Sequence, residues 1–166
     1  MGYVKENLIS GETLTYSGRL HWVASARLFL LSVIFALAGL ALVSLLFSND
    51  RRGLKVPDRL GPAVLVPFVL AAGCAGAGIL RLSSAEFAVT NKRVILKVGL
   101  LRKRTLEIFL GKIESIGVDQ TVLGRILGYG KIVVRGTGGT FETFDHISRP
   151  LDFRKQVQEQ IGRQSG

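Results

Sequence analysis

The sequence predicts an α+β membrane protein, built from a two-helix transmembrane hairpin and an antiparallel β-barrel or sandwich that a C-terminal helix caps. Two long apolar runs lie in the first half of the chain. After residue 84 the hydrophobic pattern changes from helical spacing to alternation, and after residue 149 helical spacing returns. These observations divide the chain into a lead-in (1–27), a hairpin (28–80) and a β domain (81–166).

The lead-in is expected to contain one strand and an anchor at the membrane surface. Leu14 and Tyr16 alternate with threonines, which is the period of a β-strand. His21 and Trp22 stand shortly before the first apolar run, where an amphipathic ring favours the depth of the lipid headgroups. We therefore interpret His21 and Trp22 as interfacial anchors.

Residues 28–47 and 60–80 are expected to cross a membrane. The first run has no ionisable side chain in 20 positions, and the second has only the thiol of Cys74 in 21. At 1.5 Å per residue each run would cover roughly 30 Å, the thickness of the hydrocarbon core. A cleaved signal peptide is the alternative for the first run, but 27 residues precede it and no convincing cleavage site closes it. We therefore expect both runs to be anchors.

The distribution of basic residues predicts that both termini face the cytoplasm. The connecting segment, 48–59, carries four: Arg51, Arg52, Lys55 and Arg59. Seven lie near the spans on the other side: Lys5, Arg19, Arg27, Arg81, Lys92, Arg93 and Lys97. The side with more Lys and Arg usually stays in the cytoplasm.

The second run carries small residues four positions apart, which is a pattern of close helix contact in lipid. Ala72 pairs with Gly76, Gly73 with Ala77, and Cys74 with Gly78. This face would pack either against the first span or against a second copy in a homo-oligomer. Cys74 is the only cysteine, so an intrachain disulfide is excluded.

Short alternating runs follow in the β domain, separated by glycines and other turn formers. The expected strands are 86–90, 92–98, 104–110, 113–122, 131–135 and 140–147. A helix is expected over 150–163, because Pro150 suits a first helical position and an apolar stripe follows at Phe153, Val157 and Ile161.

The glycine-rich stretch 124–139 resembles a phosphate loop in composition only. Neither glycine cluster completes the G-x-G-x-x-G spacing, and the Gly-Lys-Ser/Thr of a Walker loop is missing. We therefore assign these glycines to turns, where a positive φ is easy only for glycine.

The chain shows no pattern typical of catalysis. The two histidines, His21 and His146, are far apart in sequence, and neither a nucleophile motif nor metal-ligand spacing is present. We expect no catalytic residue, metal or cofactor, and hence no enzyme.

Positive charge indicates an anionic partner. Residues 81–166 hold 15 basic and 8 acidic side chains, a formal +7 of the chain's +10. Anionic phospholipids or an acidic protein would balance this charge. Nucleic acid is not expected, because no aromatic side chains are interleaved with the basic ones. The candidate contacts are Lys92, Arg93, Lys97, Arg102, Lys103 and Arg104.

Several motifs in order resemble the bacterial pleckstrin-homology-like domain of the YdbS type. They are the T-N-x-R run at Thr90–Arg93, the K-I-E-S-I run at 112–116, and the G-R-x-L-G-Y-G run at 124–130 followed by G-T-G-G. Gly11-Glu12 and His21-Trp22 ahead of a two-span hairpin extend the likeness over nearly the whole chain.

The resemblance implies a seven-stranded bent barrel capped by a C-terminal helix, in the inner membrane of a bacterium. It implies no enzymatic chemistry. A non-enzymatic binding or scaffolding module for other membrane proteins is the expected function. The alternatives are a sensor of anionic phospholipid headgroups, since related domains use basic residues near a comparable early loop, and an accessory subunit of a transporter or enzyme complex.

Overall fold

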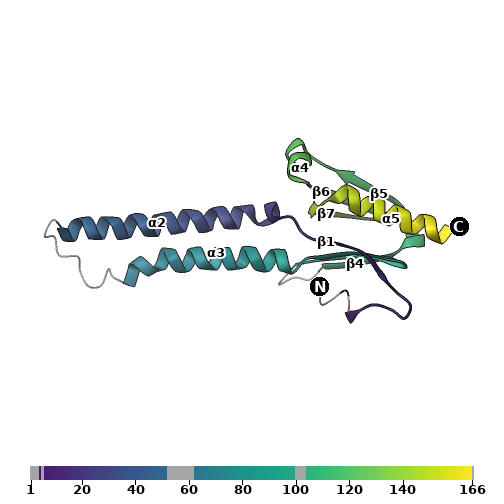
Figure 1. The fold of residues 1–166 in the computed structure, drawn as a ribbon, viewed down its shortest axis with the longest axis horizontal. Coiled ribbons are helices and arrows are strands. Elements are labelled where there is room, and N and C mark those ends of the chain that lie inside the picture. The colour runs from purple at the N-terminus through teal and green to yellow at the C-terminus, as the bar shows by residue number, and fades with distance from the viewer. Residues whose placement is uncertain (1–3, 5, 52–61, 100–103, 166) are drawn as a thin grey trace. The chain divides into compact units, whose positions relative to one another are not determined.

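The computed structural model describes the chain except residues 1–3, 5, 52–61, 100–103 and 166 (Figure 1). Its contacts separate two compact units. The hairpin unit is Ser25–Leu80, and the β unit combines Met1–Ala24 with Arg81–Gly166. The lead-in is therefore part of the β domain, and the hairpin is inserted into that domain in sequence.

Two helices make up the hairpin unit as the structure describes it. A 3-10 turn, η1 (Trp22–Ser25), precedes α2 (Ala26–Arg51), and a second, η3 (Pro62–Val64), precedes α3 (Leu65–Ser83). The stretches Trp22–Ser48 and Leu65–Ser83 are long and apolar enough to cross a membrane. The second helix begins five residues later than the apolar run at residue 60, and most of the connecting segment lies outside the described residues.

Glycine allows α2 and α3 to approach each other at two points. The Phe29 ring packs on Gly78, where an added Cβ would lie 2.9 Å from the ring. The Phe68 ring packs on Gly39, where an added Cβ would lie 2.8 Å from the ring. The buried Ser25 hydroxyl donates to the Gly78 carbonyl at 3.1 Å. These contacts join the start of α2 to the end of α3, and the middle of α2 to the start of α3.

Most of the small-residue face predicted to pack against the first span is open, and only its Gly78 makes that contact. Ala72, Gly73 and Ala77 are exposed, and a Cβ at Gly73 or Gly76 would meet no atom within 4 Å. Of the predicted small residues, Gly78 thus packs against the first helix, whereas Ala72, Gly73 and Ala77 do not. Use of the open part of this face between two copies stays a prediction.

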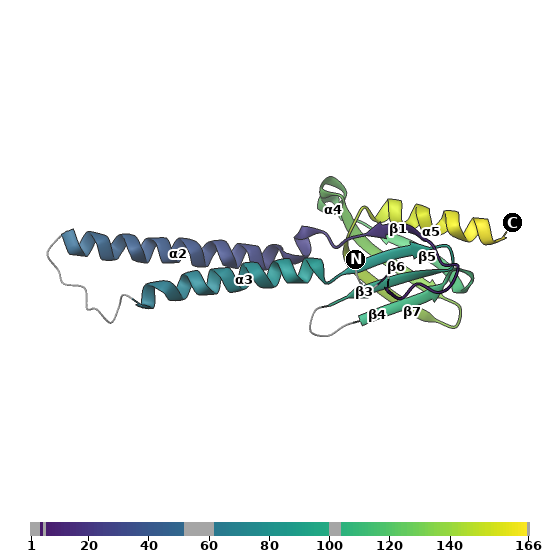
Figure 2. The same cartoon turned by 60° about the horizontal axis from the view of Figure 1, so that its bottom comes forward.

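The described residues of the β unit form two antiparallel sheets with seven strands in all (Figure 2). One sheet has the order β1-β2-β3-β4 and the other β5-β6-β7. The strands are β1 (Leu14–Gly18), β2 (Glu86–Thr90), β3 (Arg93–Val98), β4 (Arg104–Phe109), β5 (Ile113–Asp119), β6 (Tyr129–Gly136) and β7 (Thr140–Ser148). The lead-in strand was predicted correctly, and it pairs with β2 from Leu14↔Thr90 to Gly18↔Phe87.

The core lies between the sheets, and α5 (Pro150–Ser165) closes one side of it. Phe87, Leu96 and Ile132 are fully buried there, together with Phe153 and Val157 of α5. This confirms the expected C-terminal helix and its apolar stripe. Both faces of β2 and β3 are covered, because Val4, Ala88 and Ile95 form a second small cluster under the lead-in.

The predicted strand 113–122 ends at Asp119, and a short helix, α4 (Val122–Leu127), follows it. The Thr121 hydroxyl caps this helix by accepting from the Gly124 N–H at 3.0 Å. Gly128, with φ +78°, ends it in the left-handed region that favours glycine. Gly138 and Gly139 take positive φ in the β6–β7 turn, so the glycines shape turns and a helix end.

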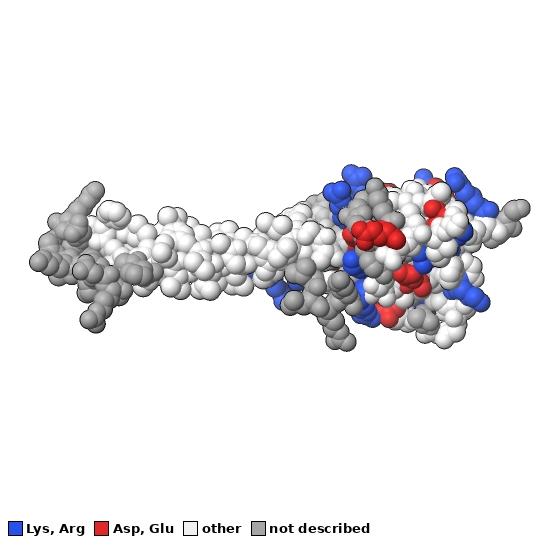
Figure 3. Space-filling view, turned by 90° about the horizontal axis from the view of Figure 1, so that it is seen from below, with Lys and Arg blue, Asp and Glu red and all other residues white. Residues whose placement is uncertain are grey.

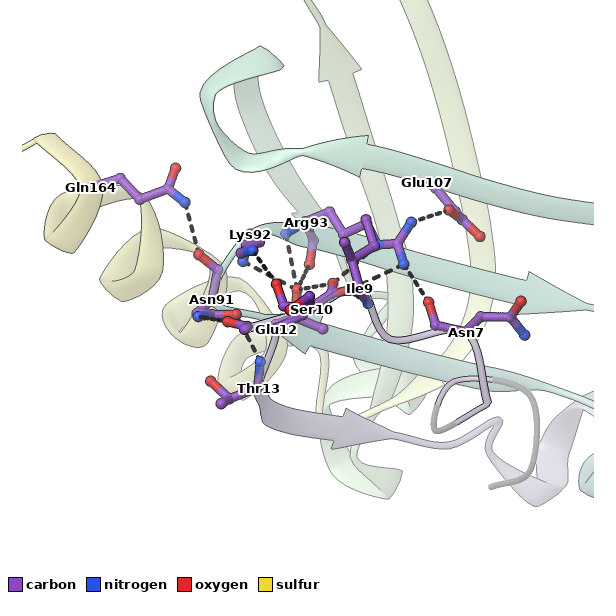
Figure 4. Close-up of polar contacts among 12 residues, drawn as sticks. Asn7, Ile9, Ser10, Glu12, Thr13, Asn91, Lys92, Arg93, Glu107 and Gln164 are labelled. Carbon is purple, nitrogen blue, oxygen red and sulfur yellow. Dashed lines mark hydrogen bonds and ion pairs between the residues drawn. The ribbon is translucent and has the colours of Figure 1, made fainter.

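A buried polar network joins the lead-in to β2 and β3 (Figure 4). The Glu12 carboxylate accepts from the Thr90 hydroxyl at 2.7 Å and from Arg93 Nε at 3.0 Å. Arg93 also pairs with Glu107 at 2.6 Å and donates to the Asn7 carbonyl at 2.6 Å. Since Glu12 and Arg93 are both buried, each compensates the other's lost hydration.

The turn between β2 and β3, at Asn91 and Lys92, also binds the backbone of the lead-in. Asn91 accepts from the Thr13 N–H at 2.8 Å and donates to the Gly11 carbonyl at 3.1 Å, while Lys92 Nζ donates to the Ser10 carbonyl at 2.7 Å. The T-N-x-R run that carries the family resemblance is thus the segment that holds the lead-in in place.

Removing the Glu12 charge is expected to destabilise the β unit. Glu12→Gln leaves Arg93 buried with less compensation, so the free energy of unfolding should fall by about 3 kcal/mol. Denaturant unfolding in mild detergent, followed by the fluorescence of the single tryptophan, Trp22, measures this. Glu114→Gln, at an exposed position of β5, is the control and should change little.

The effect should depend on pH. Burial raises the pKa of Glu12, but the bonds from Ile9, Thr90 and Arg93 outweigh burial and hold it below its ordinary value of 4.5. The advantage of wild type over Glu12→Gln is therefore full above that value and is lost as pH falls through the folded-state pKa. An advantage that grows on acidification would contradict this assignment.

Gly78→Leu is expected to destabilise the helix pair by about 2 kcal/mol, because its side chain would overlap the Phe29 ring. Gly76→Leu is the matched control, since the space around Gly76 is open. Unfolding in mixed micelles, followed by circular dichroism, compares the two. Equal losses in both variants would show that the Gly78 contact does not hold the pair.

Candidate functional site

A cleft of about 900 Å³ opens in the β unit. Its walls come from the β3–β4 region, from β7, and from the two chain segments that flank the hairpin. The lining residues are Leu20, Ala24, Arg81, Ala85, Val98, Gly99, Arg104, Thr143, Phe144, Asp145 and His146. Among the described strands β4 and β7 each pair with one other strand, and the bridge Leu20↔Ile147 covers the end of β7. The cleft therefore lies between the edge of β4 and the remaining edge of β7.

The cleft combines an apolar wall with charges of both signs. Phe144 and Ala85 are buried, whereas Arg81, Arg104 and Asp145 are exposed. Arg104 forms an ion pair with Glu142, and Asp145 lies 3.4 Å from Lys131. Exposed ion pairs of this kind contribute little to stability, so their charged groups are available to a ligand.

A stack of rings lies at one end of the β unit. Tyr129 stacks between His21, at 5.2 Å, and His146, at 5.7 Å, and Trp22 lies 5.6 Å from His21. The His21 N–H donates to the His146 carbonyl at 2.7 Å. His146 has φ +58°, which is rare for a residue with a side chain. The backbone at the cleft wall is therefore held in an uncommon conformation.

His21 is held neutral by this packing. Burial lowers its pKa, the nearby His146 lowers it further, and the bond to the backbone of Leu127 opposes both. The Val23 N–H approaches Nδ1 at 3.4 Å, so Nδ1 is the acceptor of the ring. Trp22 is exposed and His21 half-buried, so only Trp22 presents its ring to the surroundings.

The predicted basic cluster is divided between two ends of β3. Lys92 and Arg93 lie at the β2–β3 turn, and Arg93 is buried in its ion pairs, so it leaves the set of candidate lipid contacts. Lys97 and Arg104 lie near the other end of β3, where Val98 pairs with Arg104. Arg102 and Lys103 lie outside the described residues.

The surface charge of the β unit is mixed. On the face shown in Figure 3, basic and acidic side chains are interspersed over this unit. Among the residues that the structure describes, no three His, Cys, Asp or Glu side chains gather in a way that would hold a metal ion. The cleft is suited to binding a ligand with polar and apolar groups.

Sequence reasoning did not find the cleft. Arg81, Thr143 and Asp145 come from segments about 60 residues apart and share no motif. The alternation of β7 was the available sequence signal for the cleft. It shows which residues face the core, but it does not show where a cleft opens between the two sheets.

The comparisons with known proteins agree with this fold. The model of the family described as bacterial PH domain matches residues 23–165, which is most of the chain and begins after β1. No curated protein matches the chain. On the family match, the chain belongs to the bacterial PH domain family.

Proposed function

We propose that this protein is a non-enzymatic, membrane-anchored binding module. The hairpin holds the β unit at the cytoplasmic face of a bacterial inner membrane, and the cleft binds an extended segment of another membrane protein. The observation that carries this proposal is the position of the cleft between the sheet edges β4 and β7. An accessory subunit of a transporter or enzyme complex would be one form of this function.

Sheet edges favour a polypeptide ligand. An edge strand has backbone groups that a second extended chain can pair with, and alternate side chains then enter neighbouring pockets. The half-buried Leu20 and Val98 supply apolar contact, and the exposed Arg81 and Asp145 offer both signs of charge. A peptide segment can use all of these features, whereas a simple anion uses only the arginines.

An anionic phospholipid headgroup is the second candidate ligand. The observation in its favour is that Arg81 and Arg104 both line the cleft, with Arg102 and Lys103 next to Arg104 in sequence. A fragment of residues 81–166 would lack β1 and Glu12, so lipid binding is tested on the whole chain. Loss of bound anionic phospholipid from purified Arg81→Gln, with the partner protein retained, would favour this candidate.

Reversing a charge in the cleft is expected to weaken binding of the partner protein. Asp145→Arg places like charges beside Arg81 and Arg104, so recovery of the partner from mild detergent should fall about tenfold, equivalent to about 1.4 kcal/mol. Glu114→Arg, at an exposed position near the start of the edge strand β5, is the matched control. The partner is first identified with a photo-crosslinker at Thr143 in native membranes. The proposal fails if the Thr143 crosslinker captures only lipid, or if both charge reversals act alike.

Both termini are expected in the cytoplasm, because Lys and Arg are more numerous outside the connecting segment than within it. Reporter fusions after Gly53 and after Gly166 test this in cells. An external reporter should be active only after Gly53. The reverse pattern would overturn the orientation.

A further inference from the structure

We propose that α4 and Trp22 form a second membrane contact of the β unit, in which the apolar side chains of α4 enter the boundary between headgroups and acyl chains. The inference rests on the membrane anchoring proposed above. It adds that the β unit is attached at two places, through its tether and through α4.

The side chains of α4 are arranged opposite to those of an ordinary surface helix. Val122 is 79% and Ile126 74% exposed, and Leu123 and Leu127 are exposed as well. The residue that α4 buries is Gly124, whose absent Cβ would lie 2.7 Å from the Tyr129 carbonyl. A soluble surface helix buries its apolar side chains, so four exposed ones in six residues mark a contact surface.

The shape of α4 is fixed at both ends. Thr121 caps its first turn and Gly128 its last, and Gly124 holds it against β6. In Figures 1 and 2, α4 projects from the connection between β5 and β6. The apolar side chains are therefore presented on a formed helix.

The position of α4 relative to the tether identifies the bilayer as its occupant. The backbone of Leu127 bonds to His21, and Tyr129, two residues later, stacks on the His21 ring at 5.2 Å. His21 is followed directly by Trp22, where the candidate span begins. Thus one end of α4 lies within side-chain contact of the residue that precedes the span, and chain connectivity keeps α4 close to the membrane surface.

Basic residues lie near the base of α4 in the fold. Arg125 is exposed on the helix itself, and the exposed Arg19 and Arg149 lie nearby in the fold. The Ser148 N–H donates to the Arg19 carbonyl at 3.0 Å, and the Arg149 N–H donates to the Gly128 carbonyl at 2.9 Å. Apolar side chains with arginines around them match a bilayer surface, because long basic side chains reach anionic headgroups while apolar ones enter the acyl region.

The test measures the depth of one side chain of α4 in a bilayer. In a Cys74→Ala background, Ile126→Cys carries an environment-sensitive fluorophore, and the full chain is placed in nanodiscs of phosphatidylethanolamine and phosphatidylglycerol with shallow nitroxide-labelled lipid. We expect blue-shifted emission and at least threefold stronger lipid quenching than at Phe141→Cys. Phe141 is the matched control, because it is apolar, 55% exposed, and roughly 20 Å along β7 from the end that contacts the stack.

Two further positions make the outcome decisive. A fluorophore at Leu40→Cys, on the exposed surface of α2, is measured with deep nitroxide-labelled lipid and reports whether the hairpin is in the bilayer. Quenching at Leu40 with water-accessible emission at Ile126 would overturn the α4 contact and leave the anchored module intact. No quenching at either position would overturn the membrane anchoring as well. Shielding of Ile126 in native membranes but not in nanodiscs would assign α4 to a protein partner and also overturn this inference.

Arg125→Glu separates the charge contribution from the apolar one. In anionic nanodiscs this change should reduce quenching at Ile126 about twofold, and high salt should produce a similar reduction in the unchanged chain. Lys155→Glu, on the exposed surface of α5, is the control and should have no effect. An equal response to both substitutions would contradict a local role for Arg125.

Discussion

The β unit depends on the pairing of β1 with β2, because these neighbours are separated in the chain by the whole hairpin. Leu14 lies opposite Thr90, and the Glu12–Arg93 ion pair reinforces the joint over 81 positions of sequence. Closing so long a loop is costly in entropy when the intervening chain is flexible. The helix pair reduces that cost, since the bond from Ser25 to Gly78 holds the two ends of the hairpin near each other. Packing of the helix pair and completion of the sheet are thereby linked.

Local pattern was sufficient for most of the elements. Alternation predicted the strands near their observed bounds, the spacing of Phe153, Val157 and Ile161 predicted α5, and apolar length predicted α2 and α3. The helix α4 was missed because four of its six residues are apolar or β-branched and it continues a strand-like run. The Thr121 cap and Gly128 were the local signals, but a helix of this length leaves no period to detect.

Long-range contacts explain the remaining differences. Arg93 stands in a basic segment, and nothing near it in sequence shows that Glu12 and Glu107 bury it. Likewise, the spacing of small residues in α3 does not show that two phenylalanine rings of the hairpin pack on Gly78 and Gly39. The basic residues between 92 and 104 are continuous in sequence but form two separate groups in the structure, because β3 places roughly 15 Å between them. Net charge therefore describes the unit as a whole and does not locate a binding surface.

One cluster of rings connects the parts of the β unit that matter for binding. His146 lines the cleft, Tyr129 follows α4, and His21 precedes the candidate span, so the stack His146–Tyr129–His21 joins all three. A domain on a flexible tether would present its cleft in many orientations, and a partner would have to order it on binding. Attachment through both the tether and α4 would remove part of that freedom in advance, which raises affinity without any additional contact in the cleft. Burial lowers the pKa of His21, so this ring stays uncharged to a lower pH than a free histidine. The orientation of the cleft would then be set by apolar contact with the bilayer, and the charges on its rim would remain free to select the partner.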